Sequence, residues 1–295
     1  MALPPVTDSP AFSVIIPAFD EAAVIGRCLT KLTRDAPGSD GLEVIVIANG
    51  CSDATAAIAR EAAPAAWVIE IDEASKTAAI NAGLAKASHD ARIVLDADVE
   101  CDFATAQALA KAVGEPGVLV ASPAIRIDAS RCDRWVKAYY RVWSRQPYAL
   151  SGNGGAGCYA LLRETSERIG AFPPIVGDDI WFHTRIPPER KSLVARADDQ
   201  PVETIVRPPR TAREHIAVEA RRQNGNRVVM RDHPSEYYPF AKNGGALSQA
   251  IRSGAALPDV AIYFAMKFAA RIVASWHRLR GRADRWTRDE GSRLA

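Results

Sequence analysis

Two kinds of segment alternate over the first 122 residues, and this alternation limits the possible folds. Short apolar runs rich in β-branched residues are separated by longer segments whose apolar residues recur with a helical period. The short runs are predicted to be buried strands, and the longer segments helices that cover the sheet. This order predicts an α/β fold with a doubly wound, mostly parallel sheet, right-handed crossovers and helices on both faces. We expect strands at 12–16, 44–47, 68–71, 92–95 and 118–122, and helices through 24–32, 54–62, 76–87 and 103–113.

Two carboxylates, Asp96 and Asp98, stand at the end of the fourth predicted strand. Side chains two residues apart on an extended chain point to the same side, so these two would lie next to each other. Neighbouring carboxylates repel, and a divalent cation with oxygen ligands would remove that repulsion. The alternative is a polar loop whose acids cap the next helix, and an Asp-x-Asp by itself favours this alternative.

Polar residues also follow the other predicted strands: Asp20 comes after the first strand, and Asn49 and Asp53 come after the second. In a doubly wound sheet, ligands bind beyond the carboxyl ends of the strands, where these residues and Asp98 fall. Ser52 and Asp53 are also natural N-caps for the helix that follows. Helix capping does not require polar loops from several strands to meet at one edge, so this edge is predicted to bind the ligand.

The pattern changes in the second half of the chain. A segment at 131–148 has aromatic residues at helical spacing and is predicted to be a packed connecting helix, not a cofactor site. The glycine-rich segment at 151–157 lacks Gly-Lys-Ser/Thr and is therefore not a P-loop. Its glycines, among them Gly154 and Gly155, indicate close approach of a ligand to the backbone, with a mobile loop as the alternative. The apolar strand predicted at 158–162 favours a fitted surface.

Two adjacent acids, Asp178 and Asp179, precede a predicted helix at 180–185. Acids in this position are often only caps of the helix. Because they follow a possible metal site along the chain, we favour a functional role for them.

Five motifs lie in register along the chain: VIIPAFDE at 14–21, NGCSD at 49–53, KTAAINAGL at 76–84, DAD at 96–98 and GDD at 177–179. Each motif is weakly specific, but five in this order and spacing are strongly so. The chain resembles the family 2 glycosyltransferases of the GT-A fold over roughly residues 12–230. The resemblance implies an inverting transfer of a sugar from a nucleotide diphosphate sugar to a hydroxyl acceptor, with Mg2+ or Mn2+ as cofactor. UDP is the default donor nucleotide, as the commonest in the family.

The resemblance gives the acids their roles, motif by motif. It implies that Asp98 binds the metal and that Asp96 lies near the ribose. Asp179 matches the base that removes the proton of the acceptor hydroxyl. Asp178 stands where the family usually has Glu, and a carboxylate there would position the acceptor or raise the pKa of the base.

Further positions match substrate contacts of the family. Lys76 matches a basic residue near the nucleotide, although by itself it would pass as an exposed lysine at a helix start. Arg221 falls at the arginine of Gln-x-x-Arg-Trp in processive members, but Arg222 replaces the tryptophan, which argues against a processive polysaccharide synthase. The cationic residues of this segment could still close over the diphosphate, since arginine suits phosphate geometry, and a solvated helix face explains Arg213 and Arg222 equally well. The substrate-binding positions implied are Pro17, Ala18, Phe19 and Glu21 around nucleobase and ribose, Asp53 at the base, and Asn49, Lys76, Asp96, Gly154, Gly155 and Arg221.

The 295 residues suffice for one large α/β domain and an extension. We expect a catalytic domain at 12–230, with a nucleotide-binding half at about 12–122 and an acceptor half at about 123–230. A basic, helical extension is expected at 231–295.

One amphipathic helix is predicted at 258–279, with Lys267, Arg271 and Arg278 on the side opposite its apolar stripe. An apolar face with aromatic residues and a cationic rim is typical of an interfacial membrane helix, which would bring the enzyme to a lipid-linked acceptor. The alternative is a helix that packs on the catalytic domain or pairs with a second subunit. The predicted stripe contains Val260, Phe264, Phe268, Ile272 and Trp276.

Composition excludes several classes of protein. A net charge of +2 gives no reason to expect a nucleic acid partner. Five scattered cysteines without Cys-x-x-Cys favour a reducing compartment over disulfides or a zinc site. The first 11 residues lack the pattern of a signal peptide, and no apolar run is long enough to span a bilayer. We expect a cytoplasmic protein, peripheral on the inner face of the membrane if the tail helix binds lipid.

Two other functions compete with that of a glycosyltransferase. A sugar-phosphate nucleotidyltransferase shares the sheet topology, but its glycine-rich loop after the first strand is missing, and Phe19-Asp20-Glu21 stands there instead. A non-catalytic protein at the membrane that binds nucleotide-sugar or a partner stays open, although all the expected acids are present.

Overall fold

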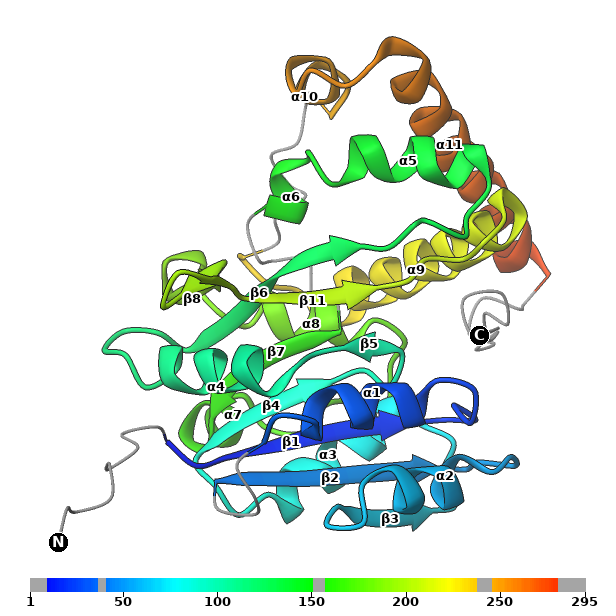
Figure 1. Cartoon of the computed structure of the whole chain (residues 1–295). Coiled ribbons are helices and arrows are strands. Elements are labelled where there is room, and N and C mark those ends of the chain that lie inside the picture. The colour runs from blue at the N-terminus through cyan, green and yellow to red at the C-terminus, as the bar shows by residue number, and fades with distance from the viewer. Residues whose placement is uncertain (1–9, 37–40, 151–156, 238–245, 281–295) are drawn as a thin grey trace, which may run out of the picture.

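The computed structural model describes residues 10–36, 41–150, 157–237 and 246–280, and Figure 1 shows the chain. Among these residues, nine strands form one sheet in the order β3-β2-β1-β4-β7-β6-β11-β5, with β8 paired to β6, and β9 and β10 form a separate pair. The strands are β1 Phe12–Ala18, β2 Leu42–Asn49, β3 Trp67–Ile71, β4 Ala91–Leu95, β5 Val99–Glu100, β6 Val120–Ile127, β7 Cys158–Leu162, β8 Lys191–Val194, β9 Arg196–Ala197, β10 Gln200–Pro201 and β11 Glu203–Val206.

The predicted doubly wound, mostly parallel sheet is confirmed, with one antiparallel strand in its middle. β3, β2, β1 and β4 run parallel to one another. β7 lies between β4 and β6 and is antiparallel to both. Because β7 comes from the second half of the chain and pairs with β4 from the first, the two halves share one sheet.

Helices cover both faces of the sheet. Val14 and Ile16 pack on one face with α1, α2 and α4, whereas Ile15 packs on the other with α3 and α8 (Figure 1). This alternation follows from the two-residue period of a strand. The helices are α1 Ile25–Thr33, α2 Thr55–Ala62, α3 Lys76–Lys86, α4 Phe103–Ala112, α5 Arg134–Trp143, α6 Pro147–Leu150, α7 Arg163–Ile169, α8 Asp178–His183, α9 Ala212–Asp232, α10 Ala246–Arg252 and α11 Leu257–Leu279, with a 3-10 helix at Pro188–Arg190.

Several predicted boundaries differ from the observed ones by two or more residues, and the strand predicted at 118–122 is β6 at Val120–Ile127; two of the differences have a clear physical cause. The first strand was expected to stop at Pro17, but β1 continues to Ala18, and Pro17 pairs with Ile47 of β2. A proline removes only its own N–H from the strand, so the remaining bonds persist. The helix predicted at 131–148 is divided into α5 and α6, and Asp133 caps the start of α5 by accepting from two backbone N–H groups at 2.9 Å.

The last helix, α11, lies along α9 and α5 at one end of the sheet (Figure 1). The prediction of a single apolar stripe was wrong, because its residues divide between two faces. Val260 is buried, whereas Phe268, Ile272 and Trp276 are exposed. The buried face of α11 contains Val260, Tyr263, Met266, Ala270 and Ala274.

Two of the cations predicted to lie opposite the stripe contact α9. Lys267 Nζ donates to Glu219 Oε1 at 3.0 Å, and Arg278 Nη1 donates to Asn224 Oδ1 at 2.6 Å. The alternative in which this helix packs on the protein is therefore correct for one of its faces. Within the described residues, no helix combines the length and apolar character needed to cross a membrane.

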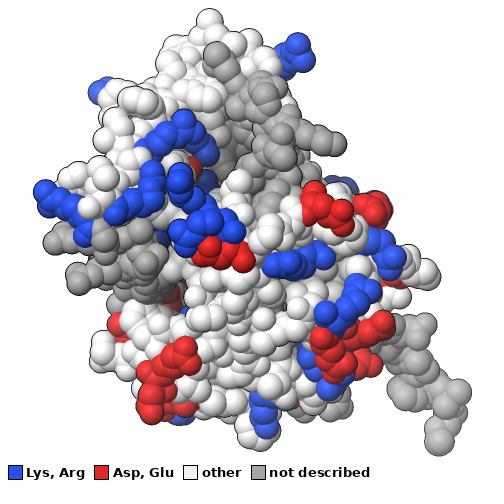
Figure 2. Space-filling model, turned by 180° about the vertical axis from the view of Figure 1, so that it is seen from behind, with Lys and Arg blue, Asp and Glu red and all other residues white. Residues whose placement is uncertain are grey.

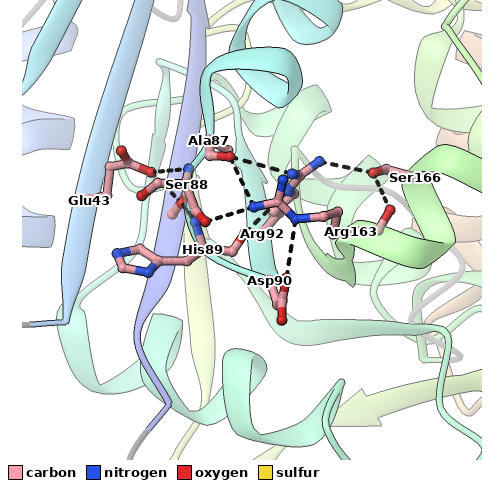
Figure 3. Close-up of polar contacts among 9 residues, drawn as sticks. Glu43, Ala87, Ser88, His89, Asp90, Arg92, Arg163 and Ser166 are labelled. Atoms are coloured by element: carbon pink, nitrogen blue, oxygen red, sulfur yellow. Dashed lines mark hydrogen bonds and ion pairs between the residues drawn. The ribbon is translucent and has the colours of Figure 1, made fainter.

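The amino-terminal edge of the sheet is fixed by a polar network (Figure 3). Glu43 accepts from Ser88 N at 2.8 Å, and the Nη2 of Arg163 donates to Ser88 O at 2.7 Å. Arg92 is buried, and its Nη1 donates to Ser166 Oγ at 3.1 Å. These charged groups hold the loop between α3 and β4, and the acids of the predicted site lie at the opposite edge.

Candidate active site

The Asp-x-Asp pair lies in a turn and not on the extended strand that was predicted. β4 ends at Leu95, and Val99 N donates to Asp96 O at 3.0 Å, which closes the turn. The argument that an extended backbone aligns the two carboxylates was therefore wrong. Ala97 nevertheless points into the core, while Asp96 and Asp98 are both partly exposed. Both carboxylates thus reach the carboxyl edge of the sheet.

Lys76 connects the two acidic motifs. Its Nζ lies 2.8 Å from Asp96 Oδ1 and 3.0 Å from Asp178 Oδ2. Lys76 is the first residue of α3, whose N-cap Ser75 accepts from Ala78 N at 3.2 Å, so the helix start fixes the lysine. Burial by itself would lower the pKa of Lys76, but the carboxylates of Asp178 and Asp96 hold this pKa well above its usual value. The ammonium group therefore stays charged.

Asp178 and Asp179 begin α8, directly after Gly177, whose φ of 112° lies in the left-handed region. Asp178 is buried and Asp179 is partly exposed, with its Oδ1 accepting from Ile180 N at 2.7 Å. Burial, and then the charge of Asp178, raise the pKa of Asp179 to about 6. A carboxylate with this pKa is ionised at neutral pH and still binds a proton readily, as a general base requires.

Hydrogen bonds fasten the loop after β1 to the loop after β2. Asp20, which has a φ of 52°, accepts from Ser52 N at 2.6 Å, and Asp53 accepts from Ala22 N at 3.1 Å. The prediction that Ser52 or Asp53 serves the start of α2 holds in part: the assigned N-cap residue is Ala54, but Asp53 Oδ1 accepts from Thr55 N, the first residue of the helix, at 2.9 Å. Ser52 does not cap the helix, because its Oγ donates to Asp20 at 3.2 Å.

The predicted nucleotide-binding positions meet at the ends of β1 and β2. The side-chain amide of Asn49 lies between Ala18 O, at 2.6 Å from its nitrogen, and Ser75 N, at 3.2 Å from its oxygen. It therefore joins β1, β2 and the start of α3. Pro17, Ala18 and Glu21 are buried, whereas Phe19 is partly exposed and Asp53 is exposed.

Two groups at this edge offer ligands for a metal. Single ligand atoms of Asp20, Cys51 and Asp53 lie within 4.8 Å of one another. The carboxylates of this group accept the loop hydrogen bonds described above, and Cys51 Sγ donates to Ala18 O at 3.3 Å. We assign this group to the fixing of the loops.

The Asp-x-Asp turn fits a divalent cation better. Gly157, with a φ of 69°, faces Asp96, and a Cβ on Gly157 would lie 2.8 Å from Asp96 Oδ2. Any residue other than glycine at this position would clash with the Asp96 carboxylate. Carboxylate oxygens are the ligands that Mg2+ and Mn2+ prefer. The turn thus offers two partly exposed carboxylates, Asp96 and Asp98, whose oxygens fit the predicted cofactor. The predicted positions Gly154 and Gly155 lie outside the described residues.

α9 passes close to Asp178 and Asp179 at the start of α8. Gly225 packs on Val176, where an added Cβ would lie 2.4 Å from Val176 O. Arg222 lies three residues earlier on the same helix, and against the larger effect of burial its charge lowers the pKa of Asp179. The predicted Arg221 is partly exposed on α9. The side chain of Arg222 pairs with Glu219 on the same helix, so only its charge acts on Asp179.

A cavity of about 400 Å³ lies beside α1 and is lined by residues of α1, β5 and β11. Arg27 Nε lies 2.6 Å from Glu100 Oε1, and Lys31 Nζ lies 3.5 Å from Asp102 Oδ2, so these two cations are paired within the protein. None of the predicted site residues lines this cavity. The candidate active site is the open edge formed by Lys76 and the acids around it.

The sequence matches a known family in comparison with other proteins. The model of Glycosyl transferase family 2 matches residues 13–161. Glycosyltransferase AglE of Haloferax volcanii is 36% identical to the chain over 93 residues. This alignment covers 30% of the chain and 31% of that relative, so the match spans about a third of the relative's length.

Solved structures share the fold. The chain aligns with mannosyltransferase PcManGT from Pyrobaculum calidifontis, solved in complex with GDP-Man and Mn2+, with a TM-score of 0.61 and 23% identity over 92% of this chain and 89% of that one. It also aligns with glucosyl-3-phosphoglycerate synthase from Mycobacterium tuberculosis, solved with Mg2+ and uridine diphosphate, with a TM-score of 0.52 and 19% identity over 77% and 81% of the two chains. At these identities the likeness establishes the fold, and the predicted GT-A architecture is confirmed.

Proposed function

Since the chain belongs to glycosyltransferase family 2, we propose that it transfers a sugar from a nucleotide diphosphate sugar to a hydroxyl group of an acceptor. The observation that carries this proposal is the contact of Lys76 with both Asp96 and Asp178. This contact brings the turn that fits a metal next to Asp178, and the adjacent Asp179 has a pKa that suits a base. A displacement needs both groups in one place, one for the leaving group and one for the incoming hydroxyl.

We propose Mg2+ or Mn2+ as cofactor and UDP as the default donor nucleotide. PcManGT was solved with GDP-Man and Mn2+, and the Mycobacterium tuberculosis synthase with Mg2+ and uridine diphosphate. Both support a nucleotide diphosphate with a divalent cation as the ligand, and both nucleotides belong in the test. When bound, the cation would be held by Asp98 and would act as a Lewis acid that offsets charge on the leaving diphosphate.

The residues of the chain supply the remaining steps. Asp179 takes the proton of the acceptor hydroxyl, and the hydroxyl oxygen bonds to the anomeric carbon while the bond from that carbon to the diphosphate oxygen breaks. Attack from the side opposite the leaving group inverts the anomeric centre. Asp178 helps to hold the pKa of Asp179 at about 6. Lys76 stays charged between Asp96 and Asp178 and reduces the repulsion between these acids and the diphosphate.

For the acceptor, we propose a lipid-linked hydroxyl compound at the inner face of the membrane, in the synthesis of a cell-surface glycan or glycolipid. The support is the basic character of α9 and α11, since α9 passes beside Asp179 and α11 packs along α9. All five cysteines are free, which agrees with a reducing compartment.

The test measures Mn2+-dependent release of nucleotide from a panel of UDP- and GDP-sugars, and transfer to a sugar hydroxyl of a lipid-linked monosaccharide. Asp98→Ala is expected to reduce the metal-dependent rate by about a hundredfold or more, because the charge on the leaving group loses its support. Asp179→Asn is expected to reduce transfer by about a hundredfold or more, because the base is lost.

Glu115→Gln serves as the control, since Glu115 is an exposed acid after α4. A wild-type rate in either active-site variant would refute the role given to that residue. Binding of a nucleotide-sugar without turnover by the wild type would instead support the non-catalytic alternative.

A further inference from the structure

The outward face of α11 carries a row of large apolar side chains. Phe268, Ile272, Trp276 and Leu279 are 64%, 56%, 44% and 87% exposed. They recur every three to four residues, so they form one stripe along the helix. We call these four residues the exposed stripe. The opposite face of the helix is buried on α5 and α9, so the stripe is held in place on a packed element.

Positive charges flank the exposed stripe. Arg271 is exposed one residue from Ile272, and the guanidinium of Arg280 lies 4.1 Å from the centre of the Trp276 ring. From Val260 to Leu279 the sequence contains no acidic residue. A surface that is apolar in its centre and cationic at its borders is complementary to an anionic bilayer, in which lipid phosphates lie above the acyl chains.

The basic character extends from α11 to its neighbour α9. The two helices together contain eight Lys and Arg residues and four Asp and Glu residues, whereas the whole chain has a net charge of only +2. In Figure 2, Lys and Arg side chains gather on the side of the molecule that carries α9 and α11. The sequence then continues after α11 with Arg282, Arg285, Trp286 and Arg288.

We propose that the exposed stripe docks on the surface of an anionic lipid bilayer, with α11 lying in the plane of the interface. Insertion of the four apolar side chains removes them from water, and Arg271 and Arg280 meet lipid phosphates. A second copy of the chain is a poorer occupant, because pairing two such stripes would bring like charges together. The inference rests on the proposed function for its link to a lipid-linked acceptor. Docking itself is measured without turnover.

The experiment is flotation of the full chain with vesicles of phosphatidylcholine alone and of phosphatidylcholine mixed with phosphatidylglycerol. The wild type is expected to float with the anionic vesicles, less so at high salt, because screening weakens the attraction of arginines to phosphates. Ile272→Glu is expected to lower the apparent affinity about tenfold or more, because it puts a charge at the centre of the stripe. Arg271→Glu is expected to weaken binding to anionic vesicles only.

Trp67→Ser is the matched control. Trp67 is 54% exposed and has Lys86 Nζ 4.2 Å from its ring centre, so it is an aromatic and cationic pair on β3, away from α11. This variant is expected to bind vesicles as the wild type does. Equal loss in Trp67→Ser and Ile272→Glu would overturn the proposal, because any exposed apolar group would then suffice.

Two further measurements separate the outcomes. Thermal unfolding is expected to be unchanged in Ile272→Glu, because the side chain is exposed, and release of nucleotide from a nucleotide-sugar without vesicles is expected to match the wild type. Vesicle binding by a wild type that releases no nucleotide would support docking while removing the proposed activity. If the wild type does not bind anionic vesicles, docking is overturned but the proposed activity is not. If light scattering then shows a dimer that Ile272→Glu breaks, the exposed stripe is an interface between two copies of the chain.

Discussion

At the scale of single residues, the site depends on Lys76. A partly buried ammonium loses hydration, and it remains charged here because two carboxylates lie within 3.0 Å of it. Asp96 comes from the turn after β4 and Asp178 from the start of α8. The lysine therefore sets both the distance between the two acidic motifs and the charge around Asp179.

The pair Asp178 and Asp179 gives a prediction about pH. The base must be ionised, so kcat/KM is expected to fall as pH drops below about 6, where Asp179 takes up a proton. Asp178→Asn removes a neighbouring negative charge, which lowers the pKa of Asp179, so the acidic limb of the remaining activity is expected to move to lower pH. The measurement is a pH profile of kcat/KM for transfer. Asp178→Glu keeps the charge and should leave the limb in place, and a limb that moves upward in Asp178→Asn would contradict this electrostatic role.

At the scale of elements, the close contact of α9 with α8 positions the basic helix at the site. Gly225 lets the backbone of α9 approach Val176 directly. Thr211 starts α9 with a capping box, in which it accepts from Glu214 N and the Glu214 side chain accepts from Thr211 N. The helix is thus fixed at its start and at its contact with α8, and Arg222 lies between these two points.

Gly225→Ala tests this contact. Alanine in a helix interior is ordinarily more stable than glycine, by about 1 kcal/mol. Here the added Cβ would meet a backbone carbonyl at 2.4 Å, so α9 must shift, and a loss of about 1–3 kcal/mol in unfolding free energy is expected. Urea denaturation measures this loss. In the control Gly26→Ala, the new Cβ meets only the side chain of Ile58 at 3.3 Å, and little change is expected. Unchanged or raised stability in Gly225→Ala would show that the contact does not restrict the helix.

At the scale of the whole molecule, two buried histidines lie in different parts of the protein, one on α8, which packs on the sheet, and one on α9, which packs on α11. His183 on α8 and His215 on α9 are almost fully buried, and their ring nitrogens have no hydrogen-bond partner among the described residues. Burial lowers the pKa of His183 to about 3 and that of His215 to about 4. Both rings are therefore neutral in the folded protein at ordinary pH.

These histidines predict how stability depends on pH. Between pH 6.5 and their folded-state values, these histidines bind protons in the unfolded chain but not in the folded chain, so they lower stability as pH drops. The raised pKa of Asp179 acts in the opposite direction, so the share of a histidine is read from a comparison with its variant. At pH 5 each histidine is expected to lower the unfolding free energy by about 2 kcal/mol relative to pH 7. The measurement is urea denaturation at both values.

His215→Phe provides the comparison. A phenylalanine ring can keep the tilted contact of His215 with Tyr139, at 4.2 Å between ring centres, without a titrating group. The pH dependence of stability is expected to shrink by the share of one histidine. Glu219, whose pKa is lowered to about 2 by Arg222 and Lys267 against the effect of burial, titrates below this range. An undiminished pH dependence in His215→Phe would contradict the assignment to His215.

The sequence by itself determined the strands of the first half and the edge at which the acids gather. Hydrophobic period and strand length are local properties, so β1 to β4 and the end of β4 at Asp96 follow from neighbouring residues. The resemblance to family 2 could be seen in the sequence for the same reason, because its motifs are short and local, and the family model confirmed it. The roles given to individual site residues remain predictions, and the tests above address Asp98, Asp178 and Asp179.

The tertiary structure decided what joins these parts. The turn at Asp96, the insertion of β7 between β4 and β6, and the bridge of Lys76 to Asp178 all depend on partners distant in sequence. The helical period of α11 predicted one apolar stripe. Packing on α5 and α9 covers part of that stripe and leaves the rest exposed. A periodic pattern records which residues are apolar, but the contacts between elements decide which of them are covered.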